Sequence, residues 1–234
     1  MKATLEVLKI LSTSLDLKKP IATVAVYPML DFLSAKWSCE GIDLGPSEED
    51  FEAGRKDLER RMASKEISFG ERFPDTEVEM IHHSRWDLMR YIVKVPLFVD
   101  YFTGVKGVGK KLDAAHIASP SSYETTREEI VPVEARPLFV LDFENLTSDM
   151  PPLFVFHGLA DTAVPFEDSD RLTGKTKARG IETRYWRLEG FDHEFDLEYP
   201  DLESAELGTP ETGDIGQKAV KEMLKDLDSL LETS

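Results

Sequence analysis

The chain has 234 residues, of which 41% are hydrophobic and 31% are charged, enough to bury one sizeable core in one domain or one domain with a cap. Its formal net charge of −17 would repel nucleic-acid phosphates and anionic lipid headgroups, so binding to nucleic acid or to a membrane surface is not expected. A single cysteine, Cys39, excludes an internal disulfide and a cysteine-based metal site. Charges are interspersed through residues 1–19, unlike a secretory signal, so we expect a cytoplasmic protein.

The first expected elements are a helix over residues 2–17 and a short strand over residues 21–27. In the helix, leucines recur every three or four residues and make one apolar stripe, which Pro20 ends. The strand, IATVAVY, is apolar at nearly every position. Strands of this kind are buried on both faces and are usually parallel, with helices above and below the sheet.

From residue 46 to residue 147 the pattern changes to helices and loops without a clear strand. Residues 47–66 form a highly charged helical stretch, and residues 85–102 are aromatic-rich and apolar, interrupted by Pro96. We therefore interpret residues 46–147 as a mainly helical cap or lid inserted into the main domain.

Strands and helices alternate again after this insertion. LFVFH at 153–157 is predicted to be a second buried strand, and ETRYWRL at 182–188 a third whose alternating polar residues suit a sheet edge. A helix over 166–179 closes at Gly180, and an amphipathic helix covers 214–231.

This alternation predicts the α/β class. We expect a core of about three parallel strands with flanking helices, built from residues 1–45 and 148–234.

Two loops carry residue types that suit catalysis. HGLADTAVP, residues 157–165, follows the second strand, and LEGFDHEFDL, residues 188–197, follows the third. Active sites of open α/β sheets form outside the carboxyl ends of the strands, so these loops should be neighbours. Asp161 lies in the first loop and His193 in the second. Because a carboxylate beside an imidazole fixes its tautomer and stabilises the imidazolium, this pair is the predicted catalytic centre.

The motifs in these loops resemble those of the α/β-hydrolases, in particular the branch of esterases, lipases and prolyl-oligopeptidase-like enzymes. The resemblance rests on H-G-x-x-D-x-x-V-P from His157 to Pro165, on G-x-x-H-x-F-D from Gly190 to Asp196, and on YPMLDF at 27–32. It implies that Asp161 is the triad acid, that His193 is the general base, and that His157 has a structural role.

One part of the family pattern is missing, because no G-x-S-x-G nucleophile elbow occurs in the sequence. The family's usual spacing would place that serine at or just before Met1. We therefore expect the chain to be the C-terminal portion of an α/β-hydrolase fold that is truncated or completed by another polypeptide. The strand at 21–27 would then have an unpaired edge, and such an edge invites self-association.

The resemblance implies a serine hydrolase that acts on a small-molecule ester or another acyl substrate, without a metal or an organic cofactor. A prolyl-oligopeptidase-like peptidase would use the same two residues. An inactive hydrolase-like protein that serves in binding or assembly would also explain the missing elbow. The predicted substrate-binding side chains are apolar or aromatic and comprise Trp86, Phe98, Tyr101, Phe102 and Val164.

His82 and His83 are adjacent histidines, but we expect them to lie in a surface loop and not in a metal site. Neighbouring side chains point in different directions, and no third ligand is evident in the sequence.

Overall fold

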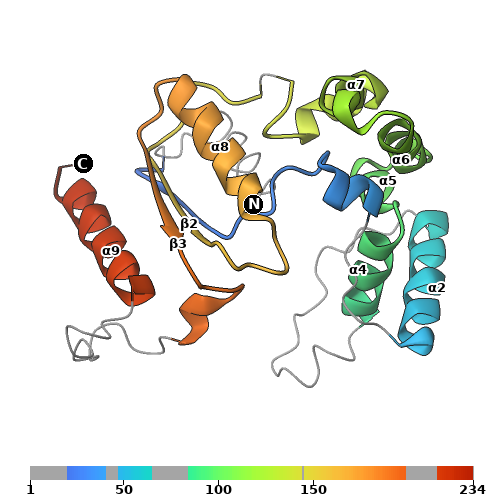
Figure 1. Ribbon diagram of the computed structural model, residues 1–234, viewed down its shortest axis with the longest axis horizontal. Helices are drawn as coiled ribbons and strands as arrows, with labels where there is room; N and C mark the ends of the chain where they lie inside the picture. Colours follow the sequence, from blue (N-terminus) through green and yellow to red (C-terminus); the bar gives the residue numbers. More distant parts are fainter. Residues whose placement is uncertain (1–19, 41–46, 65–83, 144, 199–214, 234) are drawn as a thin grey trace. The chain divides into compact units, whose positions relative to one another are not determined.

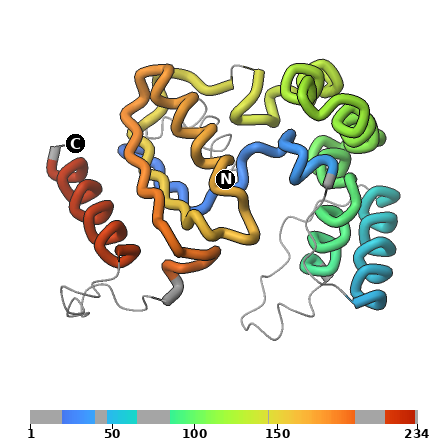
Figure 2. The backbone as a smooth tube through the Cα atoms, in the orientation of Figure 1, coloured from blue at the N-terminus to red at the C-terminus, as the bar shows by residue number. Residues whose placement is uncertain are grey.

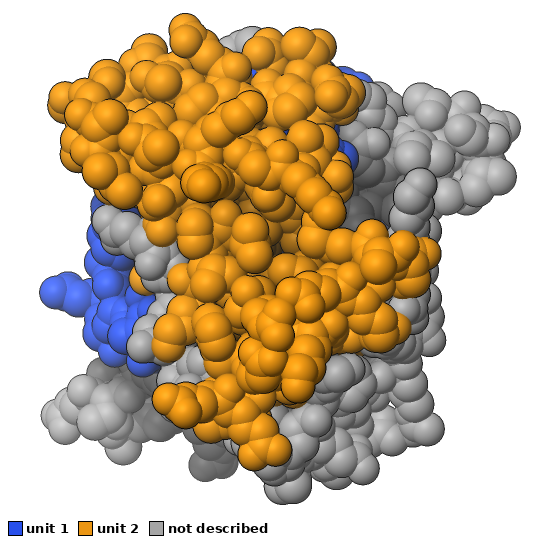
Figure 3. Space-filling model, turned by 90° about the vertical axis from the view of Figure 1, so that its right-hand side faces the viewer, with its two compact units in different colours: residues 1–31, 137–234 blue, residues 32–136 orange. Residues whose placement is uncertain are grey.

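A computed structural model describes residues 20–40, 47–64, 84–143, 145–198 and 215–233. The predicted helix at 2–17 and the pair His82–His83 lie outside the described residues. The chain divides into two compact units, coloured separately in Figure 3. Residues 1–31 and 137–234 form the sheet unit, and residues 32–136 form the helical unit.

The sheet unit is built on three parallel strands, β1 (Thr23–Val26), β2 (Leu153–Gly158) and β3 (Thr183–Leu188), in the order β1-β2-β3 (Figure 1). In the register, Val155 of β2 lies opposite Ala25 of β1 and Tyr185 of β3. The chain passes from β2 to β3 through helix α8 (Phe166–Ala178), a β-α-β unit. These observations confirm the predicted α/β class and parallel sheet.

The two faces of β2 pack against different helices, because successive side chains of a strand point to opposite faces. Leu153 and Val155 form one cluster with Leu172 of α8. On the other face, Phe154 and Phe156 form a second cluster with Met223 of helix α9 (Ile215–Thr233). Figure 1 shows α8 and α9 on opposite sides of the sheet. All of β2 is buried, so the central strand anchors the loop that follows it.

The expectation that the first strand is buried on both faces is wrong in part. Ala25 is only 2% exposed, but Ile21 and Val24 are each 40% exposed. An apolar strand is buried on both faces only where other elements pack against both faces. Among the described elements, the side of β1 that carries Ala25 packs into the core, whereas the side that carries Val24 stays partly open.

The helical unit contains five α-helices among its described residues. They are α2 (Glu48–Ser64), α4 (Ser84–Lys94), α5 (Phe98–Thr103), α6 (Val108–Ala118) and α7 (Tyr123–Ile130). The described part of this unit contains no strand, in keeping with its predicted helical character. The unit spans residues 32–136, whereas the sequence pattern placed the insertion at 46–147. Its action as a cap stays a prediction.

The helices that the structure describes fall short of a bilayer span. None of them combines the length and the apolar character needed to cross a membrane.

Candidate functional site

Two loops of the sheet unit follow the carboxyl ends of neighbouring strands and contact one another (Figure 2). After β2, the backbone N–H of Leu159 donates to Leu188 O at 2.9 Å, and that of Ala160 donates to Phe191 O at 3.0 Å. Gly158 makes this approach possible, since a Cβ at that position would lie 2.1 Å from Phe191 O. The loop after β2 and the loop after β3 therefore form one structure at the sheet edge.

Asp192 connects the two loops through its carboxylate. Its Oδ1 accepts hydrogen bonds from the Thr162 backbone N–H at 2.9 Å, the Thr162 hydroxyl at 3.1 Å and the His193 backbone N–H at 2.7 Å. Hydrogen bonds from the backbone N–H groups of Thr162 and His193 stabilise the ionised Asp192 carboxylate. They therefore lower the pKa of the Asp192 carboxyl below its ordinary value. Asp192 thus fixes the backbone on either side of the candidate site.

Asp161 is the buried carboxylate of the site. Its side chain is 0% exposed, and its Oδ1 accepts hydrogen bonds from the backbone N–H groups of Ala163 at 2.9 Å and Val164 at 2.7 Å. Its Oδ2 lies 2.9 Å from Nδ1 of His193 and 3.2 Å from Nε2 of His157. The backbone of its own loop orients this carboxylate, and two imidazoles face the same oxygen.

His193 meets Asp161 as the sequence pattern predicts, across 32 positions of the chain. The carboxylate oxygen accepts, so Nδ1 of His193 donates and carries the proton. Among the described residues, nothing forms a hydrogen bond with Nε2, and 27% of the His193 side chain is exposed. A neutral imidazole held in this way presents a lone pair on Nε2 that can take a proton.

Tyr27 is a site residue that the sequence reasoning did not identify. It directly follows β1, its ring centroid lies 4.3 Å from that of His193, and its hydroxyl donates to Asp196 Oδ1 at 2.8 Å. Burial and the hydrogen bond to the Asp196 carboxylate raise the pKa of the Tyr27 hydroxyl, so the phenol stays protonated and remains a donor. Its φ of 32° is unusual for a residue with a side chain. The YPMLDF motif contains Tyr27, but no local signal connects it to a residue 169 positions away.

The predicted substrate-binding residues fall into both units. Val164 is buried beside Asp161, where its backbone N–H donates to the carboxylate. In the helical unit, Phe98 and Phe102 pack against Phe32. The centroid of the Phe32 ring lies 5.3 Å from that of Phe98 and 4.7 Å from that of Phe102. The Arg90 guanidinium lies over the ring of Trp86, with its Cζ 5.2 Å from the ring centroid. Contact of any of them with a substrate stays a prediction.

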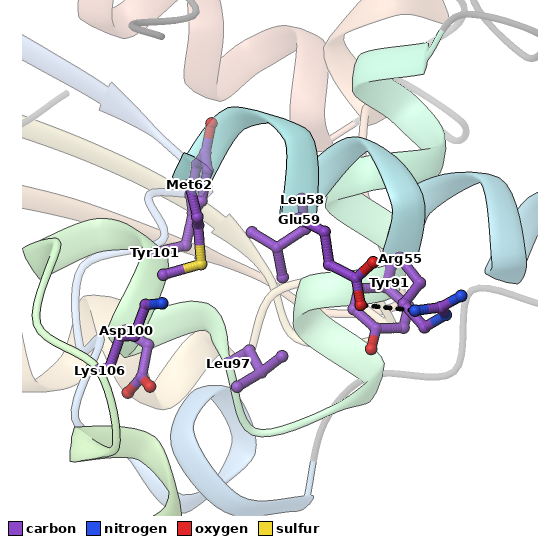
Figure 4. Close-up of a pocket in the computed structure, with 9 residues that line it drawn as sticks. All are labelled: Arg55, Leu58, Glu59, Met62, Tyr91, Leu97, Asp100, Tyr101 and Lys106. Atoms are coloured by element: carbon purple, nitrogen blue, oxygen red, sulfur yellow. Dashed lines mark hydrogen bonds and ion pairs between the residues drawn. The ribbon is translucent and has the colours of Figure 1, made fainter. Parts of the chain in front are cut away.

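The helical unit has a cavity of its own, of about 250 Å³ (Figure 4). An Arg55–Glu59 ion pair from α2 lies on one side of it, and Lys106 lies on the other. Leucine, methionine and tyrosine side chains provide its apolar surface. The full lining is Arg55, Leu58, Glu59, Met62, Tyr91, Leu97, Asp100, Tyr101 and Lys106. Of the predicted substrate-binding residues, Tyr101 is in this set.

Side chains that could bind a metal do not cluster in the part of the chain that the structure describes. No group of three or more histidine, cysteine, aspartate or glutamate residues in these segments is arranged to hold a metal ion.

Comparison with known proteins gives a partial structural likeness. The chain is similar to esterase 2 of Thermogutta terrifontis, in a structure phosphonylated by sarin, with 27% sequence identity and a TM-score of 0.24. The match covers 32% of this chain and spans 26% of that esterase chain. No protein-family model and no curated protein matches the chain. A TM-score this low gives no information about function, so the chemistry of the site is inferred from the contacts within this chain.

Proposed function

We propose that Asp161 and His193 act as the orienting carboxylate and the general base of an acyl-transfer site that hydrolyses carboxylic esters. The observation that supports this most directly is the 2.9 Å contact between Asp161 Oδ2 and His193 Nδ1 at the carboxyl ends of adjacent parallel strands. The H-G-x-x-D and G-x-x-H motifs, which resemble those of α/β-hydrolases, add to the proposal.

The roles follow from which atoms donate and which accept. His193 Nε2 takes the proton of an attacking hydroxyl as the oxygen bonds to the acyl carbon. The imidazolium then gives the same proton to the alkoxide as the acyl–oxygen bond breaks, which releases an alcohol. Asp161 stays ionised throughout, because its two backbone donors hold it as a carboxylate facing the imidazolium.

The attacking hydroxyl comes from a serine in the full family pattern, but the 234 residues contain no G-x-S-x-G elbow. In this chain alone, water attacks the acyl carbon in place of the serine. The products are then the carboxylic acid and the alcohol, formed without an acyl-enzyme. Loss of one triad member costs about 10⁴-fold or more in rate. We therefore expect slow hydrolysis, detectable only with an activated ester.

Hydrolysis of p-nitrophenyl acetate by the purified chain tests the proposal. Release of p-nitrophenol should fall to the background rate in His193→Ala and should fall strongly in Asp161→Asn. His116→Ala is the matched control, because His116 lies in the helical unit against Tyr123 and should leave the rate unchanged. A rate in His193→Ala equal to that of the wild-type chain would contradict the assignment. The corresponding p-nitroanilide separates an esterase from a peptidase that uses the same pair.

A second candidate is a binding or assembly role through β1. The observation in its favour is the 40% exposure of the apolar residues Ile21 and Val24. Among the described strands, β1 pairs only with β2, and an edge strand of this kind can pair with a strand from another copy. Sedimentation velocity over a range of concentrations should show a dimer that Val24→Thr weakens. A monomer at every concentration would exclude this candidate.

A further inference from the structure

His157 is the second imidazole that approaches Oδ2 of Asp161, besides that of His193. It belongs to the buried strand β2, and both it and Ser169 of α8 are fully buried. Its Nδ1 lies 2.7 Å from the Ser169 hydroxyl. Its Nε2 lies 3.0 Å from Val164 O and 3.2 Å from Asp161 Oδ2. A continuous line of polar contacts thus runs from Ser169 through His157 and Asp161 to His193.

The partners of His157 determine its tautomer. A carbonyl oxygen and an ionised carboxylate only accept hydrogen bonds, so Nε2, which faces one of each, carries the proton. Burial lowers the pKa of His157 and keeps the ring neutral. Nδ1 is therefore unprotonated and accepts the hydrogen bond that the Ser169 hydroxyl donates.

We propose that His157 is a positioning residue: its Nε2–H, hydrogen-bonded to Val164 O and 3.2 Å from Asp161 Oδ2, fixes the Asp161 carboxylate and thereby keeps the proton of His193 on Nδ1. This inference deepens the proposed function, because it rests on His193 acting as the general base and Asp161 as the carboxylate that orients it.

The reason lies in the two oxygens of Asp161. Oδ1 is held by two backbone N–H groups, whereas Oδ2 faces the two imidazoles and no other donor from the described segments. Without the His157 N–H, Oδ2 keeps a single partner on the partly exposed ring of His193, and the carboxylate can turn about its Oδ1 contacts. His193 would then distribute its proton over both ring nitrogens, and a ring protonated on Nε2 cannot act as the base.

Other groups near His193 do not replace this donor. Tyr27 contacts the ring of His193 without donating to Asp161, and its hydroxyl is used by Asp196. Asp192 accepts from the His193 backbone N–H. Glu194 follows His193 in the same loop and carries another negative charge. Within the described residues, His157 is thus the side chain besides His193 that places a ring nitrogen next to the Asp161 carboxylate, at 3.2 Å from Oδ2.

Nitrogen-15 NMR of the histidine rings in the wild-type chain tests the first part, with resonances assigned from His157→Gln and His193→Ala. We expect His157 to be protonated on Nε2 and not on Nδ1, with a titration midpoint below the ordinary histidine value of about 6.5. His193 should carry its proton on Nδ1 wherever it is neutral. Protonation of His157 on Nδ1, or a titration midpoint at or above the ordinary value of about 6.5, would overturn the proposal.

Two variants test the second part, with circular dichroism as the check on folding. In His157→Gln the amide nitrogen can occupy the place of Nε2, so His193 should keep the Nδ1–H tautomer. In His157→Phe the donor is lost, so His193 should show a mixture of tautomers, and p-nitrophenyl acetate hydrolysis should fall about tenfold or more. Identical His193 spectra in the two variants would overturn the proposal.

Ser169→Ala provides a milder test should His157→Phe fail to fold. It removes the donor to Nδ1 and should shift the Nδ1 resonance of His157 while His193 keeps its tautomer. An unchanged Nδ1 resonance would overturn the assignment of the Ser169 hydroxyl as its donor. Failure of the proposed function is a separate result: the chain would hydrolyse no ester, although His157 and His193 show the expected tautomers. Failure of the positioning role alone would leave His193-dependent hydrolysis intact with a different His157 tautomer.

Discussion

The ring of Tyr27 lies against the imidazole of His193, with the two ring centroids 4.3 Å apart and the planes inclined at 57°. Tyr27 directly follows β1, and His193 lies in the loop after β3, so the contact joins the carboxyl ends of the two outer described strands. The Tyr27 hydroxyl donates to Asp196, three residues after His193. One tyrosine therefore supports the loop of His193 by its ring and by its hydroxyl.

Tyr27→Phe and Tyr27→Ala should separate these two contributions. Tyr27→Phe keeps the ring contact and loses one hydrogen bond to a carboxylate, so we expect the free energy of unfolding to fall by about 1 kcal/mol with little change in ester hydrolysis. Tyr27→Ala also removes the ring, so His193 gains freedom and hydrolysis should fall about tenfold or more. Urea unfolding and p-nitrophenyl acetate kinetics measure the two effects. Equal hydrolysis by Tyr27→Ala and the wild-type chain would show that the ring does not position His193.

Gly158→Ala should disturb the site through the backbone. The added Cβ would lie 2.1 Å from Phe191 O, so one of the two loops must move and the Ala160–Phe191 hydrogen bond weakens. Overpacking of this kind costs about 1–3 kcal/mol. Gly174→Ala in α8 is the matched control, because a Cβ added there would meet nothing within 4 Å and alanine favours a helix, so it should be neutral or stabilising. Thermal unfolding of both variants checks this, and equal melting temperatures would contradict it.

The local sequence predicts the parts of the fold that local forces decide. The apolar run at 153–157 became β2, and the helix predicted at 166–179 ends at Ala178, with Gly180 at a φ of 73° just beyond it. The convergence of Asp161 and His193 follows from the parallel order of β2 and β3, since loops at the same ends of adjacent strands must meet.

Contacts between distant segments could not be predicted in this way. Nothing near Tyr27 in the sequence indicates its left-handed backbone or its hydrogen bond to Asp196. Asp192 belongs to an acidic stretch whose carboxylates cannot be told apart from the sequence, and only the fold brings Thr162, 30 positions away, to it as a partner. The exposure of Val24 depends on whether a helix covers that face, which the apolar strand itself cannot reveal.

Asp192→Asn should loosen the connection between the two loops. The amide oxygen can still accept from Thr162 and His193, but the bonds lose the strength that the ionised acceptor gives them. We expect faster amide hydrogen exchange at Thr162 and His193, while the amides of β2 keep their exchange rates. In the wild-type chain the same two amide resonances should shift as Asp192 is protonated, at a pH below the ordinary range of an aspartate because its pKa is lowered. A midpoint within or above that range would contradict the assigned hydrogen bonds.

The buried ring of His157 makes the stability of the sheet unit depend on pH. Burial lowers the pKa of His157 in the folded chain, whereas in the unfolded chain it should be near the ordinary value of about 6.5. The unfolded state therefore binds the extra proton first, so the stabilisation is complete above about pH 6.5 and is lost as the pH falls from there toward the folded-state pKa. One such group changes the free energy of unfolding by at most about 1.4 kcal/mol per pH unit. Urea unfolding at a series of pH values should show this slope in the wild-type chain and a flatter one in His157→Gln, since glutamine does not titrate. Because carboxylates contribute equally to both proteins, the difference between the two curves isolates His157, and parallel curves would show that the ring takes up its proton equally in the folded and unfolded chain.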